Sequence, residues 1–168
     1  SVAEDVLRGR SLELARQALD ELLATRAREG EKLANIVRMR AADMAARVEI
    51  VAPLVPAAIA TFQAKLADRL REAIGSGDDD RIRQEVAMFA MKIDVDEEIG
   101  RLRTHLAEVA RVLDRGGECG KRLDFLMQEL GREANTLGAK AGSQPISDCA
   151  LELKLLIEQM REQVQNIE

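Results

Sequence analysis

Apolar positions recur in steps of three and four residues along almost the whole chain, which is the spacing of one face of an α-helix. The first run starts after Ser11, a good N-cap residue, and continues to Val51. It predicts one long amphipathic helix of roughly 60 Å, ending at the turn Pro53-Leu54-Val55-Pro56. Arg26, Glu29 and Gly30 interrupt its apolar stripe. A helix of this length usually buries its stripe against a returning helix or another subunit.

Shorter periodic runs follow the proline-containing turn. The run over 57–74 predicts a returning helix that ends at Gly75-Ser76-Gly77 and makes a hairpin with the long helix. Four further runs, separated by Asp94, Gly116-Gly117 and Gly142-Ser143-Gln144-Pro145, predict about four shorter helices. We therefore predict an all-α, oligomeric protein with a short N-terminal stub (1–10), a long helical hairpin (11–75) and a C-terminal helical domain (76–168).

Composition agrees with helix packing and narrows the possible functions. Aromatic residues make up 2% of the chain, so the core must be built from aliphatic side chains and methionine, which suit helices. The net charge of -5 excludes a globally basic nucleic-acid binder but allows a local basic site. Without Trp or Tyr the chain lacks a platform for stacking bases, and we do not expect sequence-specific reading of single-stranded RNA.

Two features bear on cellular location. Cys119 and Cys149 are thirty positions apart and belong to no CxxC motif, which predicts reduced thiols and a cytoplasmic protein. No stretch reaches the roughly 18 consecutive apolar residues of a membrane helix, so we expect no membrane contact.

The motifs that are missing restrict the chemistry. The sequence contains no phosphate-binding GxxxxGK[ST] loop, no HExxH and no GxSxG. Because His105 is the single histidine, one chain cannot assemble a two-histidine mechanism for RNA cleavage. If this protein cuts RNA, carboxylates and a divalent cation are the expected agents.

The first candidate site is the segment IDVDEEIGRLRTHL. On a helix, Glu97, Arg101 and His105 fall at i, i+4 and i+8 and so lie along one ridge, with Glu98 close by. This ridge could hold a divalent cation while the arginine addresses a phosphate. A solvated helix start with favourable dipole charges explains the same residues without any function.

The second candidate is the segment KRLDFLMQELGREANTLGAK. Its Asn, Thr and Gly residues weaken a helix, so something other than helix propensity selected them. One explanation is a polar functional face; the other is a hydrogen-bond network at a helix or subunit interface. The polar residues that crowd this helix are Arg122, Asp124, Gln128, Glu129, Arg132, Glu133, Asn135 and Thr136.

Four runs carry a family resemblance: REGEKL (28–33), EVAMFAMKIDVDEEIGRLRTHL (85–106), GKRLDFLMQELGREANTLGAKA (120–141) and ELKLLIEQMREQVQNIE (152–168). Together they resemble the C-terminal half of the YicC/YloC family of bacterial endoribonucleases. Four long runs in the right order are far more specific than a single short motif. Members of that family have another domain upstream, so the resemblance implies a C-terminal fragment.

The resemblance implies an activity and partners. The chain would be a divalent-metal-dependent endoribonuclease that hydrolyses RNA phosphodiester bonds, uses Mn²⁺ or Mg²⁺ and assembles into a hexameric ring. The alternative is a noncatalytic helical oligomerisation or RNA-binding module whose missing N-terminal half supplies catalysis.

The resemblance also implies site residues. The expected metal ligands are Glu98 and His105. The expected RNA- and phosphate-binding residues are Arg101, Arg122, Arg132, Asn135 and Lys140. The expected catalytic residues are Glu97, Glu98, His105, Asp124, Glu129 and Glu133.

Overall fold

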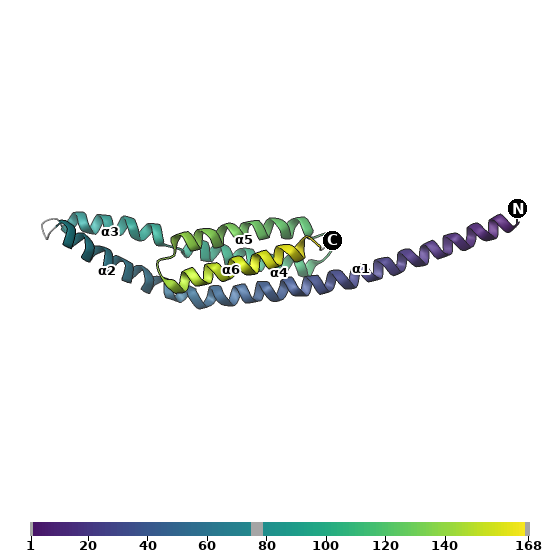
Figure 1. Ribbon diagram of the computed structural model, residues 1–168, viewed down its shortest axis with the longest axis horizontal. Helices are drawn as coiled ribbons and strands as arrows, with labels where there is room; N and C mark the ends of the chain where they lie inside the picture. The colour runs from purple at the N-terminus through teal and green to yellow at the C-terminus, as the bar shows by residue number, and fades with distance from the viewer. Residues whose placement is uncertain (1, 75–78, 167–168) are drawn as a thin grey trace.

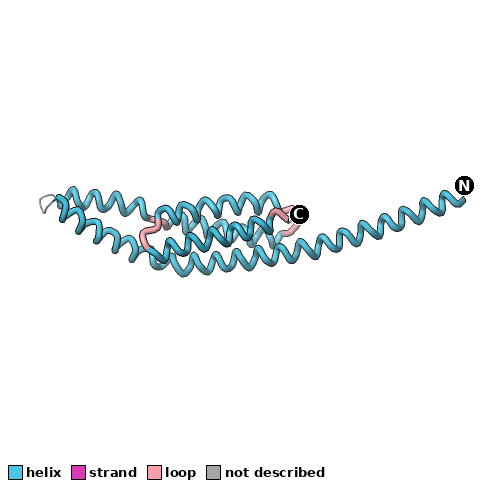
Figure 2. The backbone as a smooth tube through the Cα atoms, viewed as in Figure 1, coloured by secondary structure: helices cyan, strands magenta, loops and turns pink. Residues whose placement is uncertain are grey.

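The computed structural model describes residues 2–74 and 79–166, and these residues form helices with no strand among them (Figures 1 and 2). The predicted all-α class is confirmed. The boundary predicted between residues 75 and 76 lies outside the described residues. The elements run in the order α1 (Val2–Val51), the 3₁₀ turn η1 (Ala52–Leu54), α2 (Val55–Ile74), α3 (Asp79–Ile93), α4 (Asp96–Arg115), α5 (Gly120–Lys140) and α6 (Gln144–Val164).

A four-helix bundle forms the body of the molecule (Figure 1). α4 packs against α5, α5 against α6, and the C-terminal part of α1 against both α6 and α4, so the four helices close around one core. Aliphatic side chains and methionines at helical spacing fill this core, and no phenylalanine belongs to it. Its fully buried residues include Val37, Met44, Leu102, Leu123, Met127, Leu130, Leu153 and Met160.

Short connections set the antiparallel arrangement of α4 and α5. Gly116 and Gly117 follow α4 with φ angles of 67° and 76°, a region that favours glycine, and let the chain reverse into α5. Nearby, Arg38 Nη2 of α1 donates a hydrogen bond of 3.1 Å to the carbonyl oxygen of Leu113. This bond fastens α1 to the C-terminal end of α4.

The N-terminal part of α1 projects away from the bundle (Figure 1). The separate N-terminal stub predicted over 1–10 needs correction, because α1 already begins at Val2. Ser11 is not an N-cap: its Oγ donates to the carbonyl oxygen of Leu7 at 2.9 Å, as serine does inside a helix. The projecting leucines are 53% to 68% exposed, namely Leu7, Leu12, Leu14, Leu19, Leu22 and Leu23.

The hairpin predicted over 11–75 also needs correction. α2 packs mainly against α3, and the two form an arm that extends beyond the other end of the bundle (Figure 1). Pro53 in η1 and Pro56 in the first turn of α2 bend the chain without reversing it, because proline is tolerated where a helix begins. The four shorter helices predicted over 76–168 are present. However, α3 belongs to the arm, and part of α1 takes its place in the bundle.

Within residues 2–74 and 79–166, length and composition alone pick out one helical segment, Ala3–Ala73, with an 18-residue window apolar enough to cross a membrane. The bundle buries 11% of that window. The segment is continuous only through η1, where Pro53 interrupts the α-helix. The absence of membrane contact stays a prediction.

Both cysteines are free and buried in the core. Burial raises the pKa of the Cys149 thiol to about 11, because an apolar surrounding disfavours the thiolate. At neutral pH this thiol is protonated and unreactive. The two residues are therefore core side chains.

The bundle predicts a contrast between two methionines of α1. Met44 is 0% exposed and Met39 is 65% exposed, so both Met→Ala substitutions gain the same helix propensity but only one opens a cavity. We expect Met44→Ala to lower the free energy of unfolding by about 2–5 kcal/mol and Met39→Ala to change it by less than about 0.5 kcal/mol. Urea denaturation followed by circular dichroism measures both. Equal effects would contradict the placement of α1 in the bundle.

Candidate metal centre

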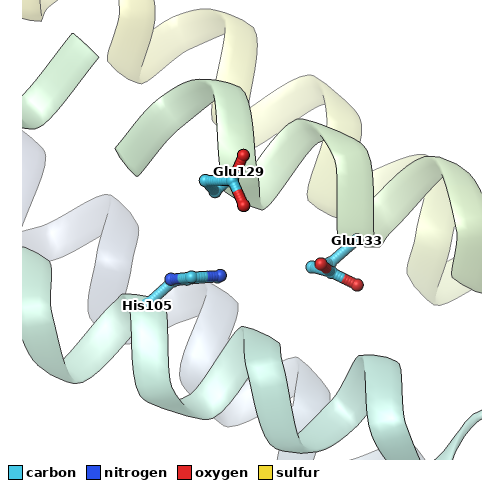
Figure 3. A group of neighbouring side chains, drawn as sticks. All are labelled: His105, Glu129 and Glu133. Atoms are coloured by element: carbon cyan, nitrogen blue, oxygen red, sulfur yellow. The ribbon is translucent and has the colours of Figure 1, made fainter. Parts of the chain in front are cut away.

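Polar side chains gather along the contact between α4 and α5. Glu129 and Glu133 are four residues apart on α5 and therefore point to the same side of that helix. His105 reaches toward them from α4 (Figure 3). Ligand atoms of the three residues all lie within 4.8 Å of one another. Antiparallel packing thus brings an imidazole next to two carboxylates that follow it by 24 and 28 positions in the sequence.

Burial distinguishes these three residues from a solvated surface. Glu133 is 2% exposed, while His105 and Glu129 are half-buried. Burying a carboxylate costs free energy unless charged partners or hydrogen bonds compensate it. The position of Glu133 therefore depends on the cations around it.

Two arginines flank the carboxylates. Arg101 Nη1 lies 3.4 Å from Glu133 Oε1, and the same guanidinium pairs with Glu97 through Nη2. Arg132 lies 3.6 Å from Glu129 Oε1 through Nη1 and 3.9 Å from Glu133 Oε1 through Nε. The negative charge of Glu97, followed by the hydrogen bond to Glu133, raises the pKa of Arg101 above its ordinary value. Arg101 is thus a permanent cation beside the acids.

Glu98 belongs to a different contact on the same helix. Its Oε1 accepts a hydrogen bond of 2.8 Å from Lys140 Nζ, and Lys140 also donates to the carbonyl oxygen of Asp94 at 3.3 Å. Glu98 is 4% exposed. Because α4 rises 1.5 Å per residue, Glu98 stands about 10 Å along the helix from His105. This geometry does not bring together Glu98 and His105, the expected pair of ligands, and it groups His105 with Glu129 and Glu133.

The remaining predicted residues lie elsewhere on α5. Arg122 Nη2 is 3.2 Å from Glu108 Oε1 of α4, and its guanidinium lies 5.4 Å from the centre of the Phe125 ring. Asp124 accepts a hydrogen bond of 2.9 Å from Gln128.

Asn135 is exposed on α5. The structure therefore unites Glu97, Arg101, His105, Glu129, Arg132 and Glu133 and leaves Arg122, Asp124 and Asn135 outside this group.

Glu108, another acidic residue of the α4–α5 contact, was not among the predicted site residues. This glutamate lies three residues after His105, and its side chain is 17% exposed between Arg111 and Arg122. Its spacing continues the ridge of Glu97, Arg101 and His105, which was a signal available in the sequence.

The donor set fits a divalent cation. Carboxylate oxygens bind Mg²⁺, Mn²⁺ and Zn²⁺, whereas an imidazole nitrogen suits transition metals better than Mg²⁺. Ligand atoms of one ion stand about 3–4 Å apart when the bonds are about 2.1 Å long. The three ligand atoms lie within 4.8 Å of one another, which is close to that spacing.

Comparison with known proteins identifies the family of the chain. Residues 51–168 match the family model described as "Endoribonuclease YicC-like, C-terminal". The chain belongs to the YicC-like family. All residues of the candidate centre lie within the matched segment.

Two curated YicC relatives extend the similarity into α1. The Haemophilus influenzae protein is 43% identical over 150 residues, which are 89% of this chain and 52% of that protein. The Clostridioides difficile protein is 33% identical over 98% of this chain and 57% of its own length. Both carry the name "Probable endoribonuclease YicC". The chain therefore spans about half the length of these relatives.

The ion pair of Glu98 and Lys140 predicts a stability effect separate from metal binding. Lys140→Met leaves the Glu98 carboxylate buried without its cation, and we expect a loss of about 1–3 kcal/mol in the free energy of unfolding. The double variant Glu98→Gln/Lys140→Met should regain part of that loss. Chemical denaturation measures each variant, with Lys154→Met on the exposed side of α6 as the control. A loss no larger than that of the control would show that the pair is not needed.

Proposed function

We propose that this chain carries the metal-binding centre of a divalent-metal-dependent endoribonuclease that hydrolyses RNA phosphodiester bonds. One observation supports this above all: His105, Glu129 and Glu133 converge inside the segment that matches the YicC-like family. The names of the two relatives point to the same class of reaction. The proposal extends to the cytoplasm as location and to RNA as substrate.

Each residue of the centre has a task in this proposal. Glu129 and Glu133 supply carboxylate oxygens, and His105 supplies a nitrogen, which favours Mn²⁺ over Mg²⁺. A divalent cation held by these residues would supply Lewis-acid chemistry and would offset charge that develops on a phosphate. Glu129 is 23% exposed and is therefore the more accessible of the two carboxylates. Its oxygen that does not bind the cation would be the base for an attacking water.

The substrate would be held through its phosphates. Arg101 and Arg132 flank the carboxylates, and their planar guanidinium groups suit bidentate contacts with phosphate oxygens. Arg122 and Lys140 stand farther along the same pair of helices and extend the row of cations. Binding of this kind depends on salt and not on base sequence, which agrees with the lack of stacking aromatics.

Substitutions at the centre test the proposal. We expect His105→Ala and Glu133→Gln each to lower Mn²⁺ affinity by at least about 100-fold, since each removes a direct ligand. Isothermal titration calorimetry measures the affinity. Cleavage of a labelled structured RNA with Mn²⁺, Mg²⁺ or EDTA should fall in parallel, in this chain and in a full-length relative.

The matched control is Glu158→Gln, which removes an exposed carboxylate of α6. If Glu98→Gln abolished Mn²⁺ binding while Glu133→Gln left it unchanged, the ligand assignment would move back to Glu98. Cleavage by the full-length relative alone would assign this chain a supporting role.

A second function is favoured by the exposed leucines of α1. Leu12, Leu19 and Leu22 continue, at helical spacing, the stripe that Val37 and Met44 bury in the bundle. We propose that this stripe packs against further copies of the chain, and that the hexameric ring implied by the family resemblance is the resulting assembly. A noncatalytic oligomerisation module would need only this surface.

Sedimentation velocity tests self-association. At micromolar concentration we expect the chain to sediment as an oligomer and Leu12→Gln/Leu19→Gln to sediment as a smaller species, because polar side chains weaken an apolar contact. Glu21→Gln on the same helix serves as the control. A monomeric unsubstituted chain would remove this second function while leaving the metal centre in place.

A further inference from the structure

Glu133 is a buried carboxylate of the α4–α5 contact that lies beside two arginines. Its Oε1 lies 3.4 Å from Arg101 Nη1 and 3.9 Å from Arg132 Nε. The same residue is one of the three that converge as possible metal ligands. A divalent cation bound there would therefore compete with a guanidinium for the same buried carboxylate.

Arg101 is the nearer of the two arginines to Glu133, and it is the one that also pairs with Glu97. Its side chain is 46% exposed, whereas the side chain of Glu133 is 2% exposed. Its second partner, Glu97, is 68% exposed and lies one helical turn earlier on α4. Glu97 can keep the guanidinium near the centre after its contact with Glu133 is lost.

The charges of the group change sign when a divalent cation arrives. Glu97, Glu129 and Glu133 bring three negative charges, which face the two positive charges of Arg101 and Arg132. A divalent cation turns this small excess of negative charge into an excess of positive charge. Such a group repels Arg101 from the cation and attracts an anion, and a phosphate is the anion that a planar guanidinium binds best.

Resting on the function proposed above, we propose that Arg101 is an exchangeable counterion. It neutralises Glu133 while the centre lacks a cation, leaves Glu133 when a divalent cation takes that carboxylate, and then binds a phosphate of the RNA. Arg101 is thus a positioning residue that couples cation binding to RNA binding. By linkage, RNA must strengthen cation binding by the same factor.

The alternative is that Arg101 only supports Glu133. A supporting residue holds the carboxylate in the orientation that a cation needs, so its removal weakens cation binding. A competitor has the opposite effect. The sign of the change in Mn²⁺ affinity therefore separates the two roles without any measurement of cleavage.

The experiment uses Arg101→Gln and two probes. Isothermal titration with Mn²⁺ alone measures cation affinity. Fluorescence anisotropy with a labelled 2′-O-methyl RNA hairpin, at constant ionic strength with Mn²⁺ or EDTA, measures RNA affinity. Arg103→Gln is the matched control because Arg103 lies on the same helix, carries the same charge and pairs with Glu49 of α1 at 2.6 Å.

We expect Arg101→Gln to bind Mn²⁺ about 3- to 10-fold more tightly, because a nearby competing cation is gone. In the unsubstituted chain Mn²⁺ should strengthen RNA binding by about 5-fold or more, and the variant should lose most of that gain. RNA binding in EDTA should change little more than in Arg103→Gln.

Two outcomes overturn the inference. If Arg101→Gln weakens Mn²⁺ binding or leaves it unchanged, Arg101 supports the site or is irrelevant to it, and the proposed metal centre still stands. If the unsubstituted chain binds no Mn²⁺, the metal centre fails and the exchange fails with it.

Discussion

The antiparallel packing of α4 on α5 is the constraint on which the rest of the molecule depends. It places Glu98 and Glu133 where little water reaches them, at 4% and 2% exposure. A buried carboxylate is tolerated only beside a cation, and the same packing supplies Lys140 to the first and Arg101 to the second. The bundle is thus held in one register by charge pairing as well as by its aliphatic core.

Helical periodicity was sufficient to predict the helices but not to predict which helices pack against each other. The apolar stripe of α1 has the same spacing before and after Gly30, yet Leu19 is exposed and Met44 is buried. A stripe specifies which face of a helix is apolar; it does not specify what covers that face. The prolines after α1 posed a similar ambiguity, because Pro53 and Pro56 are compatible with a bend as well as with a reversal.

The residues of the candidate centre were predicted on separate helices, but their grouping was not. Spacing along α4 put Glu97, Arg101 and His105 on one ridge, whereas from spacing Glu129 and Glu133 were predicted only as members of a polar helix. Spacing along each helix could not predict which residues of α4 lie opposite which residues of α5. That register depends on where the glycine turn reverses the chain and on how the core residues interdigitate.

Arginine at position 101 has a property that lysine would lack. Its planar group contacts Glu97 through one nitrogen and Glu133 through another, so it can release one carboxylate while the other still holds it. An ammonium group also has several donors, but they share one nitrogen, so both carboxylates would have to approach the same atom. A helical framework that fixes both acids and permits one exposed guanidinium to move can therefore keep the carboxylates neutralised before a cation binds. It does so without placing a loop at the centre.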